Sequence, residues 1–417
     1  MTASPLVVML SAAHPPDDVR VVVKEGAALA AAGWRVRHLC PAGAEVAPAM
    51  VADVSIAVFP RARGRWARLR DIPALARRAA AMRADVLHAS EPDAWVAAWL
   101  AARGGRARLV IDVHEHYPSR LDAVLPAVLR PLARAALRGF CRAIGKRADA
   151  VVDAKDGLAG DFGAGALCVP VRNHADALPV TPRVHRAGPL RLVHLGALTR
   201  ARGWPEMLGA LALTPPETRL VLLGRFTDGS EVDFSREAAR LGLTARIEMQ
   251  GWQPRADALA AAAGCDVGLV LFQPGEENHR LALPHKLFDC MLAGLPVVAP
   301  SFATEVAGVV RESDCGMLVD SADPSAIAAA IAALADPASR ARMGAAGRQA
   351  ALTRFSWNVE AARLVALYDQ LAPRGESALT PGTTGRAPGE AVSRAAYARA
   401  PVAVPPDIPV AVPHASA

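Results

Sequence analysis

Short apolar runs rich in β-branched residues alternate with longer Ala-, Leu- and Arg-rich amphipathic stretches from residue 6 to about residue 370. Short runs of this kind predict strands and the amphipathic stretches predict helices. Their alternation is typical of βαβ units, so we predict an α/β fold with parallel sheets. The predicted strands are 6–10, 36–40, 54–59, 85–88, 108–112, 150–154, 190–196, 219–224, 246–251, 266–272, 296–300 and 316–320.

A polar, proline-punctuated segment at 179–189 interrupts the alternation and divides it into two series of similar size. At about 150 residues per domain, a chain of 417 residues has room for two domains. We predict Rossmann-like, doubly wound domains at 1–185 and 186–371. The remainder, 372–417, is rich in Pro, Ala and Gly with little apolar periodicity, and is expected to be a disordered tail.

The composition excludes a disordered or fibrous protein, because 52% of the residues are apolar and 5% are aromatic. The six cysteines occur singly, without the spacing of metal ligands, and are interpreted as reduced, mostly buried thiols. No zinc site is expected.

The net charge of +7 is unevenly distributed, since residues 1–185 carry a net charge of +8 and the rest a net charge of −1. Two arginine-rich amphipathic stretches, 61–84 and 121–147, account for much of it. Each could lie on an anionic membrane surface, and the alternative is a solvated helix face packed on a sheet. Without aromatic residues for stacking or a recognition motif, nucleic acid is not an expected partner.

The N-terminus has no basic region before its apolar run, and no apolar run reaches about 18 residues without charge. We therefore expect a cytoplasmic location, with peripheral association at the inner face of the membrane left open.

The segment 192–208 has the features of an anion-binding turn. A strand leads into Gly196, a loop with Arg200 and Arg202, and then Gly203 before a predicted helix. Glycine lets the backbone approach a phosphate, the helix N-terminus offers free N–H groups, and arginine offers a forked donor. The alternative is a glycine turn with solvated arginines.

The segment 275–298 follows a predicted strand, and Pro284 is placed to open a helix. Lys286 and Asp289 lie one turn apart, so one can hold a phosphate while the other accepts from sugar hydroxyls. The alternative for Asp289 is an ion pair with Lys286. Loops that follow strands of one parallel sheet converge at one edge, and here they predict a site for a nucleotide diphosphate.

These residues resemble the GT-B glycosyltransferases of family 4 over positions 1–371. In that family a glycine, a six-residue step and a Lys-Gly pair bind the donor diphosphate, and here Gly196, Arg202 and Gly203 fit that pattern with arginine for lysine. Ala197 stands where members commonly have arginine, and Arg200 or Arg225 could substitute.

The family's second mark is two glutamates separated by seven residues, one near the donor sugar and one on the ribose. Asp289 takes the second position and Leu281 the first. A subset of similar proteins has an asparagine-containing loop before Pro-x-Lys-Leu-Phe-Glu, which Asn278 and residues 284–289 resemble. The resemblance implies a sugar contact from Glu276, Glu277 or Asn278.

In the first half, the sequence 14–36 is similar to the family's opening loop and helix, and Asp18 and Arg20 fall in that pattern. Asp18 could also be a simple helix N-cap. In 110–120, His114 maps onto a histidine that similar enzymes place against the donor sugar. We predict catalytic roles for His114 and for Glu115 beside it, whereas His116 is expected to be a bystander.

The resemblance implies transfer of a sugar from a UDP- or GDP-sugar to a cell-envelope, polysaccharide, lipid-linked or small-molecule acceptor, with retention of anomeric configuration. It also implies no metal and no cofactor besides the nucleotide sugar, because Arg202, Lys286 and helix N-termini would neutralise the diphosphate. Leu281 and Ala197 leave a non-catalytic nucleotide-sugar-binding protein as an alternative. A nicotinamide dehydrogenase is excluded because no Gly-x-Gly-x-x-Gly turn follows strand 6–10.

Overall fold

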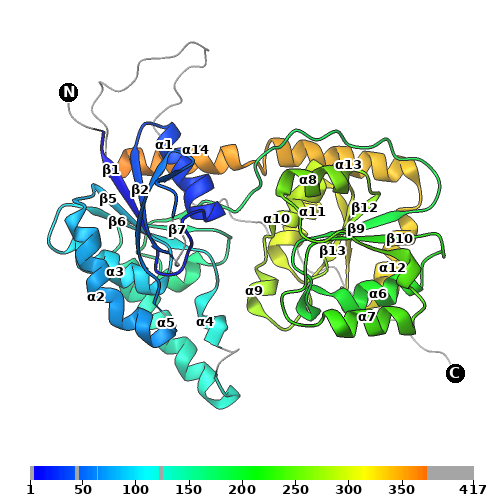
Figure 1. Cartoon of the computed structure of the whole chain (residues 1–417), viewed down its shortest axis with the longest axis horizontal. Helices are drawn as coiled ribbons and strands as arrows, with labels where there is room; N and C mark the ends of the chain where they lie inside the picture. Colours follow the sequence, from blue (N-terminus) through cyan, green and yellow to red (C-terminus); the bar gives the residue numbers. More distant parts are fainter. Residues whose placement is uncertain (1–3, 43–46, 63, 122–124, 373–417) are drawn as a thin grey trace, which may run out of the picture. The chain divides into compact units, whose positions relative to one another are not determined.

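The computed structural model describes residues 4–42, 47–62, 64–121 and 125–372. It contains two parallel-sheet α/β domains, which confirms the predicted fold class (Figure 1). The predicted tail, 372–417, lies outside the described residues apart from Ala372, as do residue 63 and residues 122–124 of the two arginine-rich stretches.

The first sheet has the strand order β3-β4-β2-β1-β5-β6-β7-β8 and is parallel except for the β3–β4 pair. All six strands predicted in this half are present, and the two that sequence patterns missed, β3 and β8, are only two and three residues long. The strands are β1 (Leu6–Leu10), β2 (Arg35–Ala42), β3 (Met50–Val51), β4 (Val54–Pro60), β5 (Val86–Ala89), β6 (Arg108–Val113), β7 (Ala150–Asp153) and β8 (Cys168–Pro170).

Side chains alternate between the two faces of this sheet, because successive residues of a strand point to opposite sides. On β6, Leu109 and Ile111 join the apolar core beneath α2, α3 and α5 (Figure 1). Asp112 points to the other face, where η1, α1 and α14 lie. The helices of this half are η1 (Val19–Gly26), α1 (Ala27–Ala31), α2 (Arg65–Ala81), α3 (Pro92–Ala102), α4 (Tyr117–Arg120), η3 (Ala127–Leu129), α5 (Arg130–Gly145) and η4 (Ala159–Phe162).

The helix expected to start at Asp18 begins there, but its first eight residues form a π-helix. The Asp18 carboxylate caps it by accepting from the backbone N–H groups of Arg20 and Val21 at 3.0 and 2.9 Å. The i→i+5 repeat brings residues five apart onto one side, and Arg20 accordingly forms an ion pair with Glu25 at 2.8 Å. Short π-helical segments are rare and often occur at functional sites.

The second sheet is fully parallel, in the order β11-β10-β9-β12-β13-β14, and all six strands predicted for it are present. Val193 and Leu195 on β9 pack with α8, α10 and α11, whereas Leu192 packs with α6, α7 and α12 on the opposite face. The strands are β9 (Arg191–Leu195), β10 (Arg219–Leu223), β11 (Ile247–Met249), β12 (Val267–Leu269), β13 (Val297–Pro300) and β14 (Gly316–Val319).

The helices of this half include two short ones that border the candidate site, η5 and α9. The full set is η5 (Arg200–Arg202), α6 (Trp204–Ala212), α7 (Glu231–Arg240), η6 (Thr244–Arg246), α8 (Arg255–Ala263), α9 (Glu277–Arg280), α10 (His285–Leu292), α11 (Thr304–Ser313), α12 (Pro324–Ala333), α13 (Pro337–Leu352) and α14 (Trp357–Leu371).

Each sheet has one point where the strand order reverses, between β1 and β5 in the first and between β9 and β12 in the second. Ligands of such sheets bind beyond the carboxyl ends of the strands at this switch point. We therefore expect ligands to bind at the loops that follow β1, β5, β9 and β12.

The last helix, α14, contacts α1 and η1 of the first domain although its sequence follows the second sheet. Its Tyr368 hydroxyl lies 2.6 Å from Nδ1 of His88, and its ring meets Trp34 edge to face. The boundaries that we predict at 185 and 371 stay predictions.

The six cysteines are free thiols, and all but Cys168 are buried. Burial raises the pKa of Cys141 to about 12, so this thiol is protonated at neutral pH. Among the described residues, no helix combines the length and the apolar character needed to cross a membrane.

Candidate functional site

One pocket of about 640 Å³ is lined by loops of both domains. Five of the residues proposed for the site from the sequence line it, namely Glu115, Arg202, Glu276, Glu277 and Asn278. Its lining residues are Glu115, Ser119, Arg120, Lys155, Arg202, Phe272, Gly275, Glu276, Glu277, Asn278, His279, Ala282, Leu283 and Pro284.

Arg202 enters the pocket from the turn between β9 and α6. Gly203 makes this turn possible, since it has a φ of +82° and a Cβ there would lie 2.3 Å from the carbonyl oxygen of Leu271. The guanidinium lies 6.0 Å from the centre of the Phe272 ring and has no ion pair among the residues that the structure describes. Burial lowers the pKa of Arg202, so its poorly solvated charge favours an anionic ligand.

The other two residues predicted in this turn do not line the pocket. Gly196 directly follows β9 and has a φ of +84°. Its N–H donates to the carbonyl of Leu223 at 2.7 Å. Arg200 forms an ion pair with Asp233 at 2.6 Å and stacks over Trp204. This pair is exposed and contributes at most about 1 kcal/mol, so Arg200 can leave it for a stronger partner.

Lys286 and Asp289 on α10 are separated from each other and do not form the ion pair that was the alternative to a ligand role. Nζ of Lys286 is buried 2.9 Å from Nε2 of His194, and the Asp289 carboxylate pairs with Arg255 at 2.8 Å. Burial lowers the pKa of Lys286 well below its usual range and raises that of Asp289. Neither lines the pocket, so their phosphate and ribose contacts stay predictions.

Leu281 occupies the position where similar proteins have a glutamate, and it is 4% exposed within the apolar core of the first domain. A Cβ placed on Gly157, in the loop after β7, would lie 3.0 Å from its Cδ2. The surroundings of this position suit a leucine, because a buried carboxylate without a partner is costly.

Asn278 and Glu277 therefore offer polar atoms to the pocket in place of residue 281. The Asn278 side chain accepts from the His116 N–H at 3.0 Å and donates to the Ser119 hydroxyl at 3.3 Å. Glu277 forms an ion pair with Arg280 at 2.6 Å. This contact uses the backbone of His116, whereas its imidazole Nε2 lies 3.1 Å from the Asp161 carboxylate, and the expectation that His116 is a bystander stays a prediction.

His114 lies at the carboxyl end of β6 and donates a hydrogen bond from Nε2 to the buried Asp112 carboxylate. Its ring meets that of His14 edge to face, with centroids 5.0 Å apart. Glu115, the next residue, points into the pocket and forms an ion pair with Arg120 at 2.7 Å. His114 itself is not one of the lining residues, and its predicted catalytic role remains a prediction.

Sequence patterns missed His14, which lies in the loop after β1. Its Nδ1 lies 2.8 Å from the Asp18 carboxylate, and the Glu91 carboxylate accepts the backbone N–H groups of residues 12–14. Burial alone would lower the pKa of His14, but its hydrogen bond to Asp18 and the charge of Glu91 raise it to about 9. The signal was available, because these loops follow β1 and β5 at the switch point.

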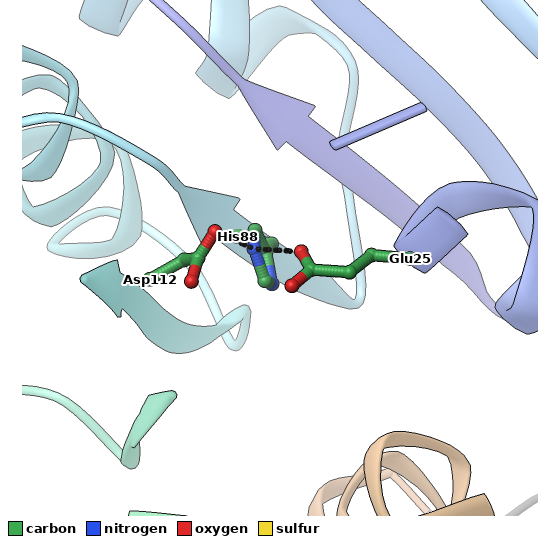
Figure 2. Close-up of side chains that lie close together, drawn as sticks. All are labelled: Glu25, His88 and Asp112. Carbon is green, nitrogen blue, oxygen red and sulfur yellow. Dashed lines mark ion pairs between the residues drawn. The ribbon is translucent and has the colours of Figure 1, made fainter. Parts of the chain in front are cut away.

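Asp112, the hydrogen-bond partner of His114, belongs to a buried charged network with Glu25 and His88, and Figure 2 shows these three side chains close together. Nε2 of His88 lies 3.3 Å from the Glu25 carboxylate and 3.5 Å from that of Asp112. Arg20, a predicted site residue, pairs with the same two carboxylates at 2.8 and 2.9 Å and also donates to the carbonyl of Val171. Arg20 therefore orients Asp112 and lies outside the pocket.

Glu25, His88 and Asp112 have the composition of a metal site, with candidate ligand atoms within 4.8 Å of one another. Burial alone would lower the pKa of His88, but Asp112 and Glu25 raise it to about 9. Arg20 and a protonated His88 together balance the two carboxylates. Arg20 already contacts both carboxylates, so we interpret the cluster as part of an ion-pair network.

This network makes the stability contribution of His88 dependent on pH. Its pKa is about 9 in the folded chain and about 6.5 in the unfolded chain, so its contribution is complete below pH 6.5 and is lost as the pH rises past 9. We expect His88→Gln to lower the free energy of unfolding by up to about 3 kcal/mol more at pH 6 than at pH 10. Urea unfolding of both proteins at each pH measures this difference.

The variant must be compared with wild type at the same pH, because the effect of Lys24 on stability changes with pH in the opposite direction to that of His88. Burial lowers its pKa to about 7, so its contribution to stability increases with pH. A cost of His88→Gln that does not change between pH 6 and pH 10 would show that His88 is uncharged in the network.

Two family matches cover most of the chain. Residues 19–164 match the family described as Glycosyl transferase 4-like domain, and residues 182–350 match the family Glycosyl transferases group 1. The first match includes β5, β6 and the loop with His114, and the second includes the Arg202 turn and α10.

Comparisons with individual proteins agree with these family matches. The chain is 29% identical over 365 residues to a phosphatidyl-myo-inositol mannosyltransferase of Mycobacterium leprae, covering 83% of this chain and 90% of the relative. Its fold is similar to sucrose-phosphate synthase of Thermosynechococcus elongatus, with a TM-score of 0.70 and 18% identity over 88% of this chain and 99% of that one. It is also similar to HepE of Anabaena in complex with UDP, with a TM-score of 0.68 and 19% sequence identity. The match covers 87% of this chain and 99% of the HepE chain.

Proposed function

We propose a specific reaction for this chain, which belongs to the group 1 glycosyltransferases of the GT-B, family 4 type. It transfers a sugar from a UDP- or GDP-sugar to a cell-envelope, polysaccharide, lipid-linked or small-molecule acceptor. The observation that carries the donor assignment is Arg202, which enters the pocket from the turn between β9 and α6 and is a half-buried cation with no ion pair in the described ranges.

The turn favours a diphosphate for three physical reasons. The N-terminus of α6 has free N–H groups and the positive end of the helix dipole. Gly196 has no Cβ to block the approach of a phosphate, and nothing lies within 4 Å of where one would be. Arg202 adds a charge-assisted donor. A structural neighbour crystallised with UDP is consistent with this assignment.

The sugar would then lie near Asn278 and Glu277, on the side of the pocket towards Glu115. His114 and the positively charged His14 beside it would stabilise negative charge that develops on the leaving phosphate. We propose that the reaction retains the anomeric configuration and needs no metal, because fixed protein cations supply the neutralising charge.

Donor turnover tests this proposal. UDP-, GDP- and ADP-sugars are screened by calorimetry, and release of nucleotide from the best binder is followed with and without EDTA. We expect micromolar binding of a UDP- or GDP-sugar, nucleotide release that EDTA leaves unchanged, and a product of retained configuration by NMR. Binding of no nucleotide sugar would refute the donor assignment, and loss of release in EDTA would refute the metal-independent reaction.

The acceptor side favours substrates at an anionic membrane. Val128 in η3 and Leu132 in the first turn of the arginine-rich α5 are 82% and 74% exposed and flank Arg130. Apolar side chains beside basic ones bind the interface of anionic bilayers. We expect the chain to sediment with phosphatidylglycerol vesicles, and Val128→Ser with Leu132→Ser to reduce the bound fraction severalfold.

A matched control is Val232→Ser on α7, which is 67% exposed in the second domain and should change nothing. Equal sedimentation of the double variant and wild type would show that α5 does not contact the bilayer.

A further inference from the structure

Lys155 is a further cation in the pocket beside Arg202 and Arg120, and it comes from the first domain. It follows β7 by two residues and lines the pocket together with Arg202. Among the described residues it has no hydrogen bond or ion pair through its ammonium group. A lysine that is not exposed and has no partner carries a desolvation cost that an anionic ligand would offset.

The carboxylates of the pocket form their ion pairs or close contacts with residues other than Lys155. The carboxylates that share the pocket each have a cationic neighbour, since Glu115 pairs with Arg120 and Glu277 pairs with Arg280. Glu276 is 64% exposed and lies 3.9 Å from His279. Lys155 and Arg202 are therefore the pocket cations without an ion pair within the described part of the chain, although the charges of Glu115 and Glu305 favour the charged form of Lys155.

The loop that carries Lys155 is held in place by the two residues that follow it. Asp156 forms a bidentate pair with Arg172, at 2.9 and 3.0 Å. Gly157 has a φ of +87° and lies against Leu281 of the second domain. A cation on a fixed loop is preorganised, so its binding energy is not spent on ordering the chain.

We propose that Lys155 is an anion-binding residue that, together with Arg202, holds a phosphate group of a substrate in this pocket. The inference rests on the proposed function and adds to it a first-domain contact for phosphate. Burial lowers the pKa of Lys155, while Glu115 and Glu305 act in the opposite direction, and a bound phosphate would favour its charged form further.

Two sources can supply this phosphate, and binding measurements on the full chain separate them. UDP and GDP report on the donor diphosphate. Glycerol 3-phosphate, a simple phosphate monoester, reports on a phosphorylated acceptor when it is added to the chain saturated with the better nucleotide. Lys155→Met keeps the length and apolar stem of the side chain and removes its charge. Lys146→Met, at an exposed lysine outside the pocket, is the control.

We expect Lys155→Met to weaken one of these probes about tenfold or more, with an unchanged thermal midpoint and no effect of Lys146→Met. Weaker nucleotide binding assigns Lys155 to the donor, and weaker glycerol 3-phosphate binding alone assigns it to the acceptor. If wild type binds the probes and Lys155→Met binds both equally well, this inference is wrong and the proposed function stands. If wild type binds neither nucleotide, the proposed function fails first.

Discussion

Arg202→Ala is expected to weaken binding of the donor nucleotide by about 10- to 100-fold. The guanidinium lines the pocket and has no ion pair with any residue that the structure describes, so its hydrogen bonds to a phosphate are formed without breaking such a pair. A hydrogen bond to a charged group contributes about 1.5–3 kcal/mol, which corresponds to that loss of affinity. Calorimetric titration with the preferred nucleotide measures it.

Arg202→Lys should bind with intermediate affinity, because lysine keeps the charge but loses the forked donor geometry. Arg236→Ala is the matched control, since Arg236 lies on α7 and is 75% exposed in a pair with Asp233. Unchanged donor affinity in Arg202→Ala would place the diphosphate elsewhere and remove the main support for the donor site.

Asp112→Asn is expected to lower the free energy of unfolding by about 3–5 kcal/mol, because it leaves buried cations without their counter-charge. Asp112 is fully buried and accepts from Arg20 and His114. Arg20 also holds the pKa of the Asp112 carboxyl well below its usual range, although burial acts in the opposite direction. Urea unfolding gives the stability change as a shift of the midpoint.

Two controls define what this result means. Asp257→Asn removes an exposed carboxylate on α8 and should change stability by less than about 0.5 kcal/mol. Glu115→Gln leaves the buried network intact and removes a pocket carboxylate, so it should affect turnover more than stability. A midpoint for Asp112→Asn that matches wild type would show that Arg20 and His88 have other partners.

The sequence predicted most of the fold because strand and helix periodicities are local. Twelve predicted strands are all present, and those that were missed, β3 and β8, are too short to have a pattern. The Arg202 turn was also predicted locally, since glycine and the helix start occur within a few residues of the arginine. The π-helix at 19–26 was not, because its i→i+5 pairs depend on what covers Arg20 and Glu25.

The sequence by itself therefore determined the α/β architecture, the family resemblance and the placement of Arg202. Only the tertiary structure decided which polar residues meet. It placed Lys286 against His194, Asp289 against Arg255, and Lys155 in the pocket, through contacts between residues 34 to 92 positions apart or between loops of different domains. The physical reason is that burial and charge partners arise from the packing of distant segments, and side-chain spacing along the chain does not encode them.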